Sequence, residues 1–151
     1  MITGLGDDTA KIESWLDALL QQLTPVARRK MLREVATALR KQQQNTIGQQ
    51  KNPDGSAFVP RKLRARQGRI KGKMFMKLRT SAFLKTVVTP DSASVFFDGR
   101  VQHIAQVHHY GLRDKVSPRG PVVQYTRRQL LGMNPASQAL IRQLLLTHLS
   151  R

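Results

Sequence analysis

Residues 24–47 read TPVARRKMLREVATALRKQQQNTI, and this stretch predicts a long amphipathic helix. Thr24 is a good N-cap, and Pro25 is tolerated at the first helical position. Apolar side chains then recur at helical spacing; they are Ala27, Met31, Leu32, Val35, Ala36 and Leu39. Residues 9–23 show the same period. We therefore predict an N-terminal helical hairpin over residues 1–47.

Downstream, the sequence predicts a small antiparallel sheet and further helices. Two β-branched or aromatic runs, residues 82–89 and 93–98, are separated by Pro90-Asp91-Ser92 and predict a β-hairpin. The other predicted elements are one or two helical turns at 74–78, a short helix at 101–110 ended by Gly111, a basic loop at 112–121, a third strand at 122–126 and a C-terminal helix at 136–149 capped by Asn134-Pro135. The predicted fold class is α+β.

The middle of the chain has a different composition. Asn52-Pro53-Asp54-Gly55 has the chemistry of a turn. Residues 61–79 contain nine bases and no acid, and such a segment cannot bury enough apolar surface to order itself. We interpret residues 48–73 as a long basic arm or loop. The whole chain, residues 1–151, is then one domain, in which residues 74–151 form the sheet and the C-terminal helix.

Charge is the strongest compositional signal. The 151 residues contain 26 Lys and Arg against nine Asp and Glu, a net charge of +17. Residues 1–34 hold five acids and five bases, so the other 117 residues carry the whole excess. This imbalance indicates a polyanionic partner or an acidic neighbouring subunit. No apolar run approaches the roughly 20 residues that span a bilayer, and the N-terminus lacks a secretion signal, so we expect neither membrane insertion nor export.

The sequence offers little for catalysis, metal binding or a cofactor. There are no cysteines, which excludes disulfides and thiolate chemistry. His103 and His108 are five residues apart, and His108 and His109 are adjacent, so neither pair has the spacing of two ligands on one helical face. Nine carboxylates, mostly in caps and turns, are hard to assemble into an acid–base pair. We predict that these histidines cap, pack or line an interface.

The candidate contact residues are the cations of the arm. They are Arg61, Lys62, Arg64, Arg66, Arg69, Lys71 and Lys73. They could neutralise phosphates, with an affinity that falls steeply with salt. Only Phe58 and Phe75 flank the run, so the interleaved aromatics of single-strand binders are missing. An arm that orders against an acidic protein surface explains the same residues equally well. A basic nucleic-acid-binding protein, such as a DNA packaging accessory, is therefore the alternative function.

Four landmarks stand in order along almost the whole chain. They are Arg28-Arg29-Lys30-Met31, then Asn52-Pro53-Asp54-Gly55 followed by an aromatic residue and Pro60-Arg61, then Ile104-Ala105-Gln106-Val107-His108-His109-Tyr110-Gly111, and finally Arg127-Arg128-Gln129-Leu130-Leu131-Gly132 before the closing helix. The third is similar to an Ile-Ala-x-x-His-x-aromatic-Gly signature. In their order and spacing, these landmarks resemble the phage virion morphogenesis family.

This resemblance implies a structural virion protein that acts late in assembly, in the host cytoplasm. It would work at the head-proximal end of the tail, where finished tails are completed and joined to filled heads. Proteins at that junction are generally ring-forming α+β subunits, commonly six-fold, and the family brings no catalytic residues. The implied partners are further copies, other tail and connector proteins, and virion DNA. Six copies would carry about +100, so acidic neighbours or DNA must balance the ring.

Overall fold

The computed structural model describes residues 2–3, 14, 17–18, 21–61 and 72–149. Its elements are β1 (Ile2–Thr3), α2 (Pro25–Gly48), β2 (Leu84–Val88), β3 (Ala93–Phe97), α3 (Gln102–Tyr110), β4 (Arg113–Lys115), β5 (Val122–Gln124) and α4 (Pro135–Leu149). The predicted α+β class is confirmed. Within the described part of the chain, no helix combines the length and the apolar character needed to cross a bilayer.

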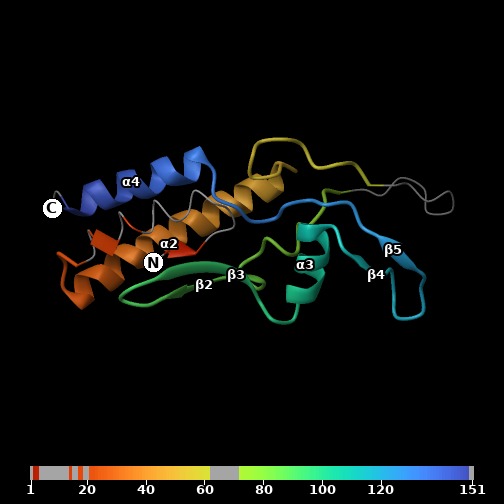
Figure 1. The fold of residues 1–151 in the computed structure, drawn as a ribbon, viewed down its shortest axis with the longest axis horizontal. Helices are drawn as coiled ribbons and strands as arrows, with labels where there is room; N and C mark the ends of the chain where they lie inside the picture. Colours follow the sequence, from red (N-terminus) through yellow and green to blue (C-terminus); the bar gives the residue numbers. More distant parts are fainter. Residues whose placement is uncertain (1, 4–13, 15–16, 19–20, 62–71, 150–151) are drawn as a thin grey trace.

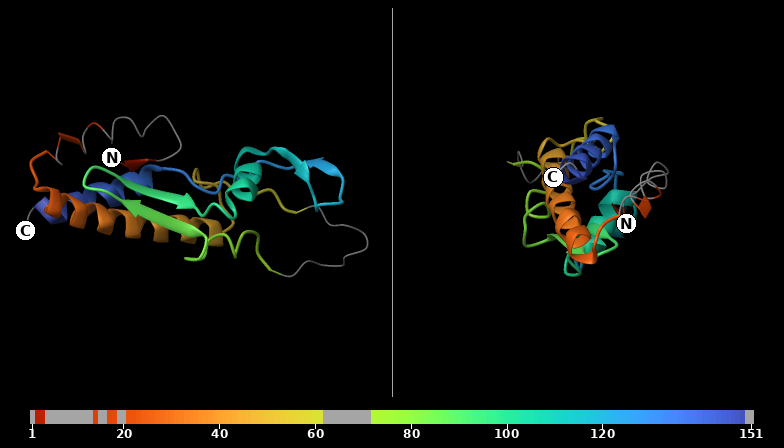
Figure 2. Two further views of the ribbon diagram at one scale, coloured as in Figure 1. Left: turned by 90° about the horizontal axis from the view of Figure 1, so that it is seen from below. Right: turned by 90° about the vertical axis from the view of Figure 1, so that its left-hand side faces the viewer.

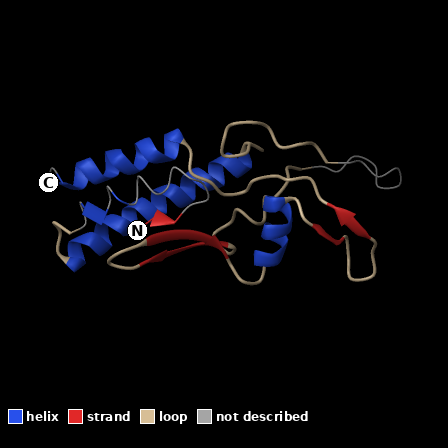
Figure 3. Ribbon diagram, in the orientation of Figure 1, coloured by secondary structure: helices blue, strands red, loops and turns tan. Residues whose placement is uncertain are grey.

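The molecule is elongated. Helix α2 runs along one half, with α4 beside it and the β2–β3 hairpin against it (Figures 1 and 2). The other half carries α3, the β4–β5 hairpin and long connections, as Figure 3 shows. The C-terminus lies at the α2–α4 end. The two ends of the molecule are therefore built from different kinds of structure.

Helix α2 begins as the sequence predicts. The Oγ1 of Thr24 accepts a hydrogen bond from the backbone N–H of Ala27 at 3.2 Å, and Pro25 is the first helical residue. The predicted apolar stripe is buried from Met31 to Leu39, and Ile47 extends it. Before Thr24, residues 14, 17 and 18 are helical, but the rest of residues 9–20 lie outside the described part. The N-terminal helical hairpin thus stays a prediction.

The predicted β-hairpin is confirmed. Strands β2 and β3 pair antiparallel from Leu84 opposite Phe97 to Val88 opposite Ala93, and β1 pairs parallel to β3 on its other side. The turn between β2 and β3 is fastened by its own side chains, with 2.7 Å between Thr89 Oγ1 and Ser92 Oγ.

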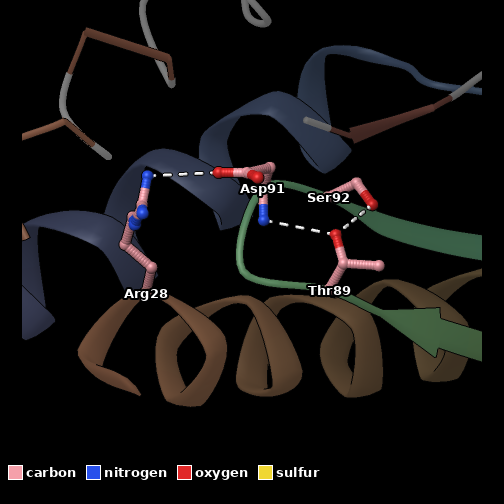
Figure 4. Close-up of polar contacts among 4 residues, drawn as sticks. All are labelled: Arg28, Thr89, Asp91 and Ser92. Atoms are coloured by element: carbon pink, nitrogen blue, oxygen red, sulfur yellow. Dashed lines mark hydrogen bonds and ion pairs between the residues drawn. The ribbon is translucent and has the colours of Figure 1, made fainter. Parts of the chain in front are cut away.

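Arg28, near the start of α2, reaches the turn between β2 and β3. Its Nη1 lies 3.1 Å from Asp91 Oδ1, as Figure 4 shows. Because the Asp91 side chain is largely exposed, this ion pair positions the turn more than it stabilises the fold. Part of the Arg28-Arg29-Lys30-Met31 landmark thus has a structural explanation, since it aligns the hairpin with α2.

Two apolar clusters hold the chain together. The first joins the N-terminal half of α2 to α4; its members include Met31, Leu32, Val35, Ile141 and Leu145. The second lies around the C-terminal end of α2; it contains Ile47, Phe58, Leu78, Leu84, Phe97, Ala105 and Leu130. The second cluster draws on segments from Ile47 to Leu130, so it fixes the half of the molecule that has little regular structure.

Two predictions about secondary structure were wrong. Residues 74–78 form turns, not helix, and Phe75 has a positive φ of 64°. Strand β5 does not join the main sheet; it pairs with β4, from Arg113 opposite Gln124 to Lys115 opposite Val122. Part of the predicted loop at 112–121 is therefore strand. The sequence Arg-Asp-Lys has no apolar alternation, which is why β4 gave no strand signal.

The basic arm does not begin at residue 48. Residues 49–60 fold back on the body, because the N–H of Phe58 donates to Gln50 O at 2.8 Å and the Phe58 ring is buried in the second cluster. The burial of Phe58 and the local turn order this segment despite its polar composition. Residues 62–71 lie outside the described part of the chain, so the arm stays a prediction there.

Candidate functional site

The two ends of the basic loop, residues 61–73, meet. Phe58 precedes the loop and Phe75 follows it, and their ring centroids lie 5.7 Å apart in an edge-to-face contact. Gln50 holds the end of the loop that rejoins the body. Its Nε2 donates to Met74 O at 2.9 Å, and its Oε1 accepts from Met74 N at 2.8 Å. The loop thus leaves and rejoins the body at one place, in the half that carries α3 (Figure 1).

Arg128 holds the segment that leads into the loop. Its Nε donates to Val59 O at 2.8 Å and its Nη2 donates to Pro60 O at 3.2 Å. The residue is only 7% exposed, and both this burial and the neighbouring Arg61 lower its pKa. A guanidinium remains protonated even so. Arg128 therefore acts as a fixed fork of donors for the two carbonyls that lead into the loop.

His108 connects this place to α3. Its ring lies 5.0 Å from the Phe75 ring and 4.9 Å from the Tyr125 ring, measured between centroids. Burial, followed by the charge of Arg128, lowers its pKa, so the neutral ring is favoured. A row of four rings, Phe58, Phe75, His108 and Tyr125, thus runs across the loop base. We use "loop base" for these four rings together with Gln50 and Arg128.

His109, the next residue of α3, makes different contacts. Its Nδ1 accepts a hydrogen bond from the backbone N–H of Leu130 at 3.1 Å, which places the proton of the neutral ring on Nε2. Burial, followed by the charge of Arg127, lowers the pKa of His109. Both histidines pack, as predicted. Among the described residues, no three His, Asp or Glu side chains come together as a metal site would require.

Lowered histidine pKa values predict acid sensitivity. The unfolded chain takes up protons near the ordinary pKa of 6.5, whereas folded His108 and His109 resist them. Stability should therefore be full above that value and be lost as the pH falls towards the lowered values. The urea midpoint should drop between about pH 7.5 and about pH 5.5. In His108→Phe, which keeps a ring between Phe75 and Tyr125, the drop should shrink; an unchanged drop would contradict this assignment.

The structure places only some of the predicted contact residues. Lys73 Nζ donates to Gly48 O at 3.1 Å, so it caps the end of α2. Arg61 lies beside Arg128, at the start of the loop. Lys62, Arg64, Arg66, Arg69 and Lys71 lie outside the described part of the chain. Three further cations, which were not predicted to be contact residues, belong to the β4–β5 hairpin; they are Arg113, Lys115 and Arg119.

Three of the four landmarks noted in the sequence, those that contain Asn52, His108 and Arg128, meet at or beside the loop base. Asn52 Oδ1 accepts from Gln129 N at 2.8 Å, which joins the turn at 52–55 to the segment at 127–132. At Gly132, an added Cβ would lie 2.6 Å from Pro53 Cγ, so only glycine allows this close approach. Segments about 77 residues apart therefore pack as one unit.

Comparison with known proteins identifies the family. The sequence model of the phage virion morphogenesis family matches residues 7–150. The chain belongs to this family. It is 38% identical over 145 residues to the protein named "Tail completion protein S" of Escherichia phage P2, and the alignment covers 93% of this chain and 97% of the phage P2 protein. No solved structure matches. The resemblance stated from the landmarks is thus confirmed.

Several landmark residues have a related structural role. His108, Gly111, Arg128 and Gly132 all serve contacts within or beside the loop base. These residues stand in the sequence landmarks, but the contacts that Arg128, Gln50 and Gln43 make were not predicted. The sequence did contain one indication that Arg128 has a structural role, because Arg128 lies in the same landmark as Gly132.

Proposed function

We propose that this chain is a structural virion protein, not an enzyme, that completes the head-proximal end of a phage tail and enables the tail to join the head. It acts as a ring-forming subunit, with a hexamer favoured, and is assembled in the host cytoplasm. The observation that carries the proposal is the near full-length similarity to the tail completion protein of phage P2. An α+β subunit with two apolar clusters suits a stable ring component.

The basic loop is the proposed docking element for an acidic surface of a neighbouring tail or connector protein. Its cations, Arg61, Lys62, Arg64, Arg66, Arg69, Lys71 and Lys73, have no acid among them. The loop base supports this role because it fixes where both ends of the loop leave the body. Docking through a segment with fixed ends requires less ordering than docking through a free tail. Complementary charge would also limit self-repulsion in a ring of subunits that carry +17 each.

A stop mutant of the phage tests the function. Without this chain, infected cells should still contain filled heads and polymerised tails, but few joined particles, because the chain acts only after both are built. Electron microscopy of lysates and the titre of infectious phage measure this outcome. A plasmid copy of the wild-type gene should restore joining. Normal yields of infectious phage from the stop mutant would end the tail-completion proposal.

The same complementation assay tests the loop. A plasmid copy carrying Arg64→Glu, Arg66→Glu and Arg69→Glu should fail to restore joining, because like charges would then face each other at the contact. The matched control carries the same charge change on exposed cations of α2; it is Arg29→Glu, Arg33→Glu and Lys41→Glu. If the loop mutant joins normally, the docking role is wrong. If the isolated wild-type protein binds duplex DNA with strong salt sensitivity, the partner is nucleic acid instead.

A further inference from the structure

An apolar pocket of about 430 Å³ lies between β3, α3 and the segment at 131–133. Its apolar wall includes Phe96, Phe97, Leu131 and Met133, and Tyr110 lines it from α3. Phe96 and Tyr110 remain 39% and 51% exposed. Large apolar side chains gathered around a hollow in this way mark an interaction surface more often than scattered exposed ones do.

The pocket is uncharged. None of the described residues that line it is Lys, Arg, Asp or Glu; its polar members include Gln43, Gln102, Gln106 and His109. The chain as a whole has 26 bases among 151 residues. Two copies that carry +17 each repel wherever cations face each other, so a contact between copies needs a surface without them. The pocket provides such a surface.

Strand β3 forms one wall of the pocket. The backbone hydrogen bonds from Asp98 N to Phe83 O and from Thr89 N to Ser92 O show that Ser92 and Asp98, which flank β3, direct their backbone groups towards β2. Because the pattern alternates, Phe97 directs its backbone to the opposite side. On that side, the described strand β1 pairs with β3 at Ala93 and Ser94.

The β4–β5 hairpin is largely uncovered. None of its six strand residues is buried, although Asp114 contacts His103 of α3 and Gln124 contacts Gly111. It carries exposed apolar side chains, with Val122 at 51% and Leu112 at 44%. It also carries Arg113, Lys115 and Arg119, so it would be repelled by most of the surface of another copy. An uncharged apolar pocket is the kind of surface that it can contact.

We propose that the pocket receives the β4–β5 hairpin of a second copy, with Val122 directed towards Phe96 and Tyr110. The two surfaces differ, so the contact is heterologous and can close a ring when it repeats. This inference rests on the ring-forming part of the proposed function and names its two surfaces. Both surfaces belong to this chain, so the contact can be tested with the isolated protein.

The absence of cysteine makes a clean cross-linking test possible. We would mix one chain carrying Val122→Cys with a differently tagged chain carrying Gln106→Cys, whose exposed side chain lines the pocket. A short bis-maleimide should give a product that contains both tags, whereas each chain alone should give only background. The control replaces Gln106→Cys with Gln143→Cys on the exposed face of α4, which should give no mixed product.

A second variant tests the charge argument. Gln106→Arg adds a cation to the pocket, so sedimentation should show self-association weakened about tenfold or more, while Gln143→Arg should leave it unchanged. Self-cross-linking of Gln106→Cys as strong as the mixed product would overturn the inference, as would an oligomeric wild type that gives no mixed product. A monomeric wild type at every concentration and salt would overturn both the inference and the ring. The phage stop mutant tests the tail-completion function separately from this contact.

Discussion

Gly111→Val should unfold the half of the molecule that contains the loop base and should block assembly. Gly111 ends α3 in the left-handed region with φ 64°. A Cβ there would lie 2.8 Å from Arg127 N and 3.0 Å from Arg127 Cα, and backbone cannot move aside as a flexible side chain can. Left-handed strain and the forced contact together should cost about 2–5 kcal/mol. That is a large part of the stability of an ordinary domain.

A pair of alanine variants separates strain from contact. Gly55 also has a positive φ, 91°, but an added Cβ there would meet nothing within 4 Å. Gly55→Ala should therefore cost only the strain, about 1 kcal/mol, whereas Gly111→Ala should cost clearly more. Urea unfolding of the two variants measures the difference. Equal losses of unfolding free energy would show that the close contact between Gly111 and Arg127 adds nothing to the cost of the substitution.

Arg128→Met should loosen the loop base. It removes the donors to the carbonyls of Val59 and Pro60, which are then left without those hydrogen bonds. The loss should be about 1–3 kcal/mol, and trypsin should cut near Arg61 faster than in the wild type. Arg128→Lys should rescue little, because an ammonium cannot reproduce the fork. The control is Arg127→Met, an exposed neighbour of the same type, which should change stability by less than about 0.5 kcal/mol.

Local chemistry was enough to predict the helix ends. Thr24-Pro25 and Asn134-Pro135 begin α2 and α4, and Gly111 ends α3, because capping and φ preferences act within a few residues. The β2–β3 hairpin was predictable for the same reason. These features depend on short-range hydrogen bonds and backbone sterics, which the sequence records directly.

The loop base was not predictable because its contacts are long-range. Gln43 is buried, and its amide pairs with both the N–H and the C=O of Gly132, 89 residues away. Arg128 reaches Val59 across 69 residues. Gln43, Gln50 and Arg128 are polar residue types that usually lie at the surface. The periodicity of apolar residues therefore cannot reveal that their side chains form hydrogen bonds with distant backbone groups. The same limitation explains why a polar stretch around Phe58 was wrongly predicted to extend from the body.

The contact between Phe58 and Phe75 makes the segment between them a replaceable cassette. Once the two ends are joined, the entropy of closing such a segment grows only slowly with its length, by about 0.6 kcal/mol for each doubling. Insertions, deletions or a reversed charge between Arg61 and Lys73 should leave the rest of the subunit folded. Evolution could thus exchange this segment to suit a different neighbour in the virion, and an engineer could graft a foreign peptide there.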